Sequence, residues 1–300
     1  MKPGPPRVPD PRARLIAWSA IVFCTVPDII WRDAGQRMSL LFTASVALPV
    51  VVAAIAVRAF PGLRGLSRFL LAVAALDFSW GYVAPALAGT DFIRSLTNGA
   101  DWGARLFFTR MTTLSGALLA GLTLIGSGLT RRDLFLCLGD VAAPAQPIGF
   151  LGLRKPIPWT WFGPAVILVF SLVLASFLYS SVNPEFGVSD RILRALPWIL
   201  AIAALNAASE EFQFRNLILA HLRNLFSPAE AVLLSATFFA LGHYFGHPSG
   251  LTGVAMAGFA GWIWARSMIE TGGSFWAFVI HLGQDIVILT FLAVAVAPAR

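Results

Sequence analysis

The chain has 300 residues, of which 57% are apolar and only 12% are charged. A soluble domain carries about 25% charged residues, so this composition excludes an ordinary soluble protein. The net charge of +7 resides in arginines between apolar segments, which disfavours nucleic acid as a partner. The short alternating segments typical of a transmembrane β-barrel are not evident in the sequence. We therefore predict a polytopic, all-α integral membrane protein that is surrounded by the lipid bilayer.

The apolar segments are long enough to cross a hydrocarbon core of about 30 Å as helices. A basic, proline-rich tail precedes them at residues 1–14, and we expect this tail in the cytoplasm. The predicted membrane-spanning helices, about eight or nine in number, are at residues 15–31, 38–57, 69–88, 106–129, 159–181, 196–222, 231–247, 251–269 and 276–297. A cytoplasmic N-terminus agrees with the positive-inside rule, because most link arginines then face the cytoplasm. The alanine- and arginine-rich composition suggests a bacterial inner membrane.

One long link divides the chain into two halves. Residues 130–158 contain Pro144, Pro147, Pro156 and Pro158, which forbid a continuous helix. The expected units are N-terminal transmembrane helices of unknown role at 15–140, a proline-rich linker at 141–158, and a second helical domain at 159–300. The residues of this second domain that are candidates for chemistry lie within 196–297.

Three charged residues interrupt an apolar segment of the second domain. Glu210, Glu211 and Arg215 lie within residues 196–222. A charge at the bilayer centre costs at least about 2.5–3.5 kcal/mol. Three charged residues in one apolar segment therefore indicate a structural or functional role. Glu211 and Arg215 are four residues apart on one helical face, which predicts a structural ion pair. Glu210 is rotated by about 100° from Glu211 and cannot share that pair equally, so it is the carboxylate left for acid or base chemistry.

Two histidines are expected within a turn or two of the depth of Glu210. Phe239 and His243 share one face of a predicted helix, and the last predicted helix contains His281 and Asp285, again on one face. Counted along their helices from one membrane surface, Glu210 and His243 lie about 20 Å deep. His281 and Asp285 lie about 12 and 18 Å deep by the same rise. A single buried histidine is more often structural, but two beside an unpaired glutamate favour a functional site.

The segment between these helices predicts close packing. Gly253, Ala257 and Gly261 are spaced four apart, and small residues at this spacing let helix backbones approach one another. Arg266 and Glu270 are also four apart, which predicts an ion pair near the end of the same helix.

Three motifs in this region resemble those of one known family. EEFQFR at 210–215 is similar to its EExxxR motif, and FALGH at 239–243 is similar to FxxxH. HLGQD at 281–285 is similar to the third motif, HxxxN or HxxxD. Together they resemble the CPBP family of CAAX proteases and bacteriocin-processing enzymes, also called the ABI family. The resemblance covers residues 196–297, about a third of the chain.

The resemblance implies an intramembrane endopeptidase with an all-α, CPBP-type catalytic core. Glu210 would be the general base that activates water, with assistance from His243. His281 and Asp285 would stabilise the oxyanion. The residues expected to support the site structurally are Glu211, Arg215 and Phe239.

The same residues leave the question of a metal open. The family was first described as metalloproteases, and Glu210, His243 and His281 could hold a zinc ion with an open coordination position. The chain has no HExxH motif, in which one helix supplies two ligands and the base, and this weakens the case for zinc. No cofactor is required by the sequence itself.

Position 285 departs from the eukaryotic CAAX prenyl protease, which has asparagine there. An ionised Asp285 cannot donate a hydrogen bond to an oxyanion. We therefore expect Asp285 to accept from His281 and so to orient the imidazole. A protonated Asp285 that donates directly is the alternative.

The predicted function is hydrolysis of a peptide bond in a membrane-anchored or hydrophobic protein or peptide. CAAX-type tails, leader peptides and sorting-signal tails are all compatible substrates, and the sequence does not choose among them. The alternative is a non-proteolytic membrane protein that uses the Glu/His cluster for ligand binding, for proton or solute transport, or as a scaffold.

Overall fold

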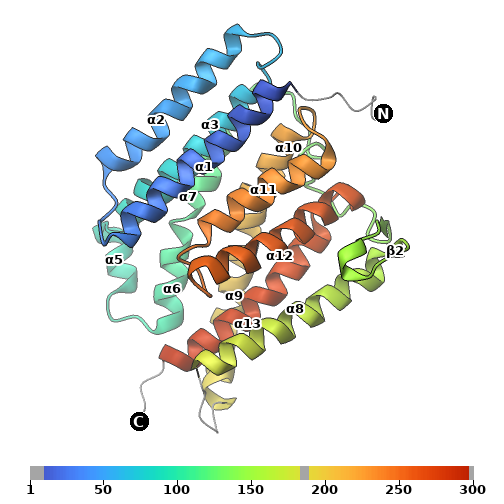
Figure 1. Ribbon diagram of the computed structural model, residues 1–300. Helices are drawn as coiled ribbons and strands as arrows, with labels where there is room; N and C mark the ends of the chain where they lie inside the picture. The colour runs from blue at the N-terminus through green and yellow to red at the C-terminus, as the bar shows by residue number, and fades with distance from the viewer. Residues whose placement is uncertain (1–9, 183–188, 297–300) are drawn as a thin grey trace.

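The protein is built from apolar helices that run back and forth past one another (Figure 1). The computed structural model describes residues 10–182 and 189–296. Within these residues, six helices are long and apolar enough to cross a membrane. The prediction of a polytopic, all-α membrane protein is therefore confirmed.

The N-terminal half begins earlier as a helix than the sequence indicated. Residues 11–14 were expected to be part of a tail, but Asp10 caps a helix there by accepting from the backbone N–H of Arg12 (2.9 Å). Proline is favourable in the first helical turn because its missing N–H is not needed there. The helices of this part are α1 (Pro11–Asp33), α2 (Leu40–Ala56) with the short η1 (Val57–Ala59), and α3 (Leu66–Phe78), which continues through the π-helical η2 (Ser79–Val83) into α4 (Ala84–Ala88).

The predicted helix at 106–129 is wrong as one continuous span. The chain forms α5 (Asp91–Thr97), α6 (Trp102–Met111), α7 (Leu114–Gly121) and η3 (Leu122–Leu124). The break lies at Thr112 and Thr113, whose hydroxyls donate to carbonyls three residues earlier at 2.7 Å. Such side-chain bonds to the backbone compete with the helical ladder. Two short helices therefore replace one long one.

The link at 130–158 contains two short strands, β1 (Pro144–Ala145) and β2 (Ile157–Pro158), and a turn, η4 (Gly149–Leu151). It packs against the turn between the last two helices: the Asp140 N–H donates to the Thr271 carbonyl at 2.7 Å. Asp133, at its start, pairs with Arg223 at 2.6 Å. The link is therefore bound to the second half rather than free of it.

The second half consists of α8 (Trp159–Val182), α9 (Ser189–Glu210), the π-helical η5 (Glu211–Leu217), α10 (Ile218–Leu222), α11 (Pro228–Gly242), α12 (Gly250–Thr271) and α13 (Phe275–Val296). The predicted end of the helix at 231–247 is wrong, because α11 stops at Gly242 and His243 is its capping residue. Gly246 and Pro248 lie three and five residues further on, and neither favours helix continuation. The imidazole of His243 is thus held at a helix end.

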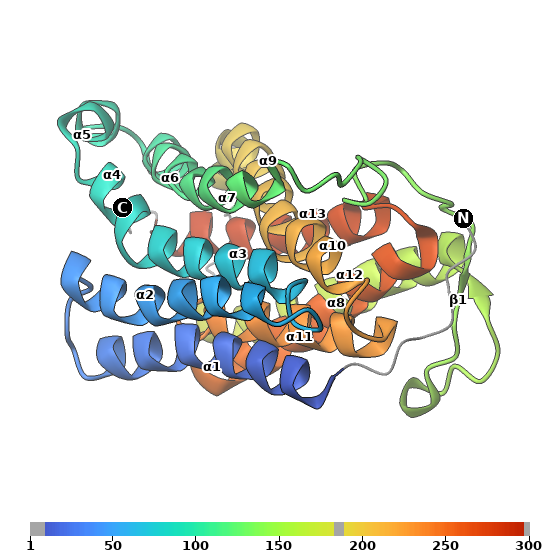
Figure 2. The ribbon, with the colours of Figure 1, turned by 90° about the horizontal axis from the view of Figure 1, so that it is seen from above.

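The two halves share one core. In Figure 1, α11 and α12 lie in the centre, with α1 to α3 on one side and α8 and α13 on the other. Figure 2 shows from above that α3 and α7 are stacked on α1 and α2. One cluster of buried apolar side chains extends from Ala13 on α1 to Ile280 on α13. The N-terminal helices therefore support the helices that carry the motifs.

Close approach between α11 and α12 depends on Gly261. A Cβ atom there would lie 3.0 Å from Arg215 Nη2 and 3.0 Å from Phe239 Cδ1. The expected pair of Arg266 and Glu270 is present at 2.6 Å, and Glu270 also accepts from the Trp159 indole at 2.9 Å. Packing on α12 and an ion pair at its end thus fix the central helices.

We expect Gly261→Leu to destabilise the fold by about 1–3 kcal/mol, because an added side chain would overpack a full interior. Thermal unfolding in phospholipid nanodiscs measures the effect. Gly121→Leu is the control, since a Cβ atom at Gly121 meets nothing within 4 Å. Equal thermal midpoints for the two variants would contradict the packing described for α11 and α12.

Candidate active site

The two adjacent glutamates lie where an α-helix changes to a π-helix. Glu210 ends α9 and Glu211 begins η5, so the straight α-helix expected through this motif is wrong. A π-helix has a wider turn than an α-helix, and such turns occur often at functional sites. The Ser235 hydroxyl donates to the Phe214 carbonyl inside this segment at 2.8 Å, which helps to satisfy the altered backbone.

As a result, the carboxylates of Glu210 and Glu211 both lie next to the imidazole of His281. His281 Nδ1 lies 2.7 Å from Glu211 Oε1, within hydrogen-bonding distance. His281 Nε2, on the other side of the ring, lies 3.6 Å from Glu210 Oε2. Trp264 stacks on the same ring with centroids 4.1 Å apart and an interplanar angle of 14°. His281 is thus fixed in position and only 3% exposed.

His243 approaches Glu210 from the end of α11. Its Nδ1 is 2.8 Å from the Phe239 carbonyl, which can only accept, so Nδ1 carries a proton. Its Nε2 then lies 3.6 Å from Glu210 Oε2. The Phe239 ring packs on the His243 imidazole with centroids 4.0 Å apart. Phe239 therefore holds His243 by its backbone and by its side chain.

Glu210 is the group on which these side chains converge. Its Oε2 is buried and has no hydrogen-bond partner within residues 10–182 and 189–296. The Nε2 atoms of His243 and His281 both lie 3.6 Å from it. The carboxylate predicted to be left over is therefore unpaired, and it faces the two histidines that the sequence placed at its depth.

The expected pair of Glu211 and Arg215 is present, with Arg215 Nη1 3.5 Å from Glu211 Oε1. Arg215 is fully buried, and its guanidinium lies 3.8 Å from the centroid of the Phe239 ring. The Trp264 ring is 4.8 Å away on another side. Cation–π contacts and one carboxylate thus stabilise a positive charge that has no exposed surface.

Asp285 lies beside His281, and its expected role of orienting that imidazole stays a prediction. The orienting nitrogen, Nδ1, is taken by Glu211, and Asp285 Oδ2 lies 3.6 Å from the opposite nitrogen, Nε2. Asp285 is instead held by Asn206, whose Nδ2 donates to Oδ2 at 3.0 Å. Asn206 Oδ1 in turn accepts from Arg110 Nη1 at 3.1 Å.

The sequence did not predict this series of hydrogen bonds from Arg110 through Asn206 to Asp285. One signal was available for Asn206, because it lies four residues before Glu210 on the same helix and so shares its face. Arg110 gave no signal, since it belongs to α6, a short helix in the other half. A link to the N-terminal half also runs through Trp80, whose indole donates to Gln213 Oε1 at 3.0 Å.

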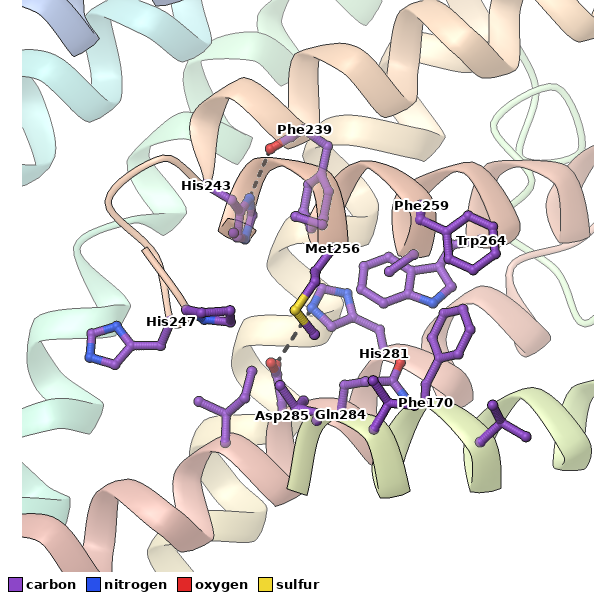
Figure 3. Close-up of a pocket in the computed structure, with 18 residues that line it drawn as sticks. Phe170, Phe239, His243, His247, Met256, Phe259, Trp264, His281, Gln284 and Asp285 are labelled. Carbon is purple, nitrogen blue, oxygen red and sulfur yellow. Dashed lines mark hydrogen bonds and ion pairs between the residues drawn. The ribbon is translucent and has the colours of Figure 1, made fainter. Parts of the chain in front are cut away.

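A cavity of about 270 Å³ opens beside these groups. Figure 3 shows His243 and His281 on its inner side, with Phe239 and Trp264 next to them. Its other walls come from α8 and α12 and are almost wholly apolar; they include Val169, Phe170, Leu174, Met256 and Phe259. His247, which matched no motif, also lines it. The site therefore combines a small polar cluster with an apolar space.

The comparisons with known proteins agree with the motifs. Residues 192–287 match a family model described as type II CAAX prenyl endopeptidase Rce1-like. The resemblance to the CAAX proteases is confirmed over this segment. It includes Glu210, His243, His281 and Asp285, and it covers about a third of the chain. No curated protein and no solved structure matches the chain.

The donor types in the Rce1-like segment suit zinc, which binds histidine and carboxylate side chains. Their arrangement does not: within the described parts of the chain, no three His, Cys, Asp or Glu side chains form a group that could hold a metal ion. The mechanism proposed for these residues therefore uses no metal, and zinc held by Glu210, His243 and His281 is the untested alternative.

Glu211 and Glu210 have different structural roles, which their glutamine variants should separate. Glu211→Gln leaves the buried Arg215 without its counter-charge, and breaking such a pair costs about 3–5 kcal/mol. Glu210→Gln removes a carboxylate whose Oε2 has no partner in the described structure, so we expect little loss of stability. Thermal unfolding of the two variants in nanodiscs measures the difference. A larger loss for Glu210→Gln would contradict this assignment.

Proposed function

We propose that this protein is an intramembrane endopeptidase that hydrolyses a peptide bond of a membrane-anchored or hydrophobic substrate. The observation that carries the proposal is the unpaired Glu210 carboxylate, 3.6 Å from two imidazoles at the wall of an apolar cavity. A carboxylate oxygen that accepts no hydrogen bond in the described residues, beside an apolar space, suits a general base. The Rce1-like match adds family-level support for proteolysis of the CAAX type.

The proposed reaction begins with a water molecule held by Glu210 Oε2. His243, with its Nδ1 proton donated to Phe239, presents the lone pair of Nε2 and accepts the second hydrogen of that water. Glu210 takes a proton as the water oxygen attacks the carbonyl carbon, and a tetrahedral oxyanion forms. The protonated Glu210 then delivers its proton to the leaving amine, so that protons balance over the cycle.

His281 is the proposed donor to the oxyanion. To donate from Nε2 while Nδ1 donates to Glu211, the ring must carry both protons, and Glu211 is the counter-charge beside it. Asp285 flanks the same Nε2 at 3.6 Å. In this proposal an ionised Asp285 acts through His281 rather than on the substrate, and Asn206 keeps it in place.

We also propose that the end of the bundle where α1 begins faces the cytoplasm. Basic side chains gather there: Arg14 pairs with Glu230 on α11 at 2.5 Å, and Arg223 pairs with Asp133 of the link at 2.6 Å. Arg266 donates to the backbone carbonyl of Gln146 in the same link at 2.7 Å. An excess of arginine is typical of the cytoplasmic side of a membrane protein. A bacterial inner membrane as its location stays a prediction.

Loss of the general base should abolish most of the activity. We expect Glu210→Gln and His243→Ala to lower kcat for a farnesylated CAAX peptide by about 10²–10⁴-fold, the usual contribution of acid–base catalysis. The assay follows cleavage in proteoliposomes by mass spectrometry, and an unprenylated apolar peptide is run beside it to test the need for the prenyl group.

Asp91→Asn is the matched control, because Asp91 is an exposed carboxylate on α5. Full cleavage by either site variant would exclude the proposed base. If neither peptide is cleaved and a proton flux depends on Glu210 in the same proteoliposomes, the transport alternative is favoured over proteolysis.

A metal-free mechanism predicts that chelation leaves the activity unchanged. Exhaustive dialysis against EDTA should not alter cleavage, because the proposed base and both imidazoles act on water and oxyanion directly. Elemental analysis of the same sample should find zinc well below one atom per chain. A stoichiometric zinc content that disappears in His243→Ala would overturn this and assign a metal to the site.

A further inference from the structure

One side chain of the third motif has no role in the mechanism above. Gln284 lies on α13 directly before Asp285 and one helical turn after His281. It is 6% exposed, and neither its Nε2 nor its Oε1 has a hydrogen-bond partner in the parts of the chain that the structure describes. An uncharged amide with both polar atoms unsatisfied is unfavourable in an apolar interior.

The amide borders the cavity. Figure 3 shows Gln284 beside Asp285, on the side of the cavity closed by Phe170 of α8. The helix α8 comes close at this point, because a Cβ atom on Gly283 would lie 3.3 Å from Ile167. The neighbouring walls are apolar, so the protein itself offers the amide almost no alternative partner.

We propose that Gln284 binds the backbone of the substrate. This rests on the proposed function, since the partner is a peptide in the cavity. A primary amide offers two N–H donors and one acceptor, so it can pair with both the C=O and the N–H of a peptide. Apolar side chains of the substrate would fill the cavity while Gln284 satisfies the backbone that enters it. Its position one turn from His281 brings that backbone to the reacting groups.

The test measures binding in the absence of turnover. Full-length Glu210→Gln protein in nanodiscs is titrated with a short fluorescein-labelled leucine-rich peptide. A series of analogues, each with one amide replaced by an ester, removes one N–H donor at a time. With Gln284 present, we expect one ester position to weaken binding about ten-fold. Adding Gln284→Leu should weaken binding of the all-amide peptide by a similar factor and abolish the discrimination between amide and ester.

Stability supplies a second readout. Replacing an unsatisfied buried amide by an apolar side chain should raise the thermal midpoint while binding becomes weaker, as at sites where function opposes stability. Thr290→Val, a polar-to-apolar change further along α13, is the control for which peptide affinity should not change. A structural role for Gln284 would instead lower the midpoint and leave the ester discrimination intact, and that result overturns the proposal.

The two proposals fail in different ways. Ester discrimination that depends on Gln284 in a protein that never cleaves the peptide would support the backbone contact and reject proteolysis. Cleavage by the wild-type protein, with ester discrimination unchanged by Gln284→Leu, would support proteolysis and reject the contact. A protein that binds neither the amide nor any ester peptide also rejects the contact.

Discussion

The buried contact between Glu211 and Arg215 is the constraint on which the site depends. Arg215 has no exposed surface and lies between a carboxylate and two aromatic rings, so its charge is compensated only inside the protein. Glu211 compensates it and also fixes His281 through Nδ1. One carboxylate therefore stabilises the membrane-embedded cation and orients the imidazole, which frees Glu210 from both tasks.

The N-terminal helices contain none of the motifs, yet they help to hold the groups around this contact in position. The π-helical segment that begins at Glu211 is held from outside by Trp80 through Gln213 and by Ser235 through the Phe214 carbonyl. Asp285 is held through Asn206 by Arg110 of α6. Helices from both halves thus fix the positions of the groups around Glu210. Precise positioning of this kind needs support beyond the residues that touch a substrate.

The sequence was sufficient to predict the membrane-protein class, the pair of Glu211 and Arg215, and the convergence of three helices on Glu210. These follow from hydropathy and from spacing along regular helices. It was insufficient where the backbone leaves the regular helix: at the Thr112–Thr113 break, at the end of α11 and in η5. For the same reason an α-helical count assigned Glu211 to Arg215 alone and did not predict its contact with His281. Contacts between distant segments, such as Arg110 with Asn206, leave no periodic trace.

The distribution of charge around His281 shows why three carboxylates can share so small a space. Glu211 is matched by Arg215, and Asp285 and Glu210 both lie 3.6 Å from the remaining imidazole nitrogen. If His281 carries both protons, it compensates only one of those two carboxylates. Asp285 has a second source of stabilisation in the Asn206 amide, whereas Glu210 Oε2 has none in the described residues. The uncompensated negative charge therefore falls on Glu210, in agreement with its proposed role as the base that activates water.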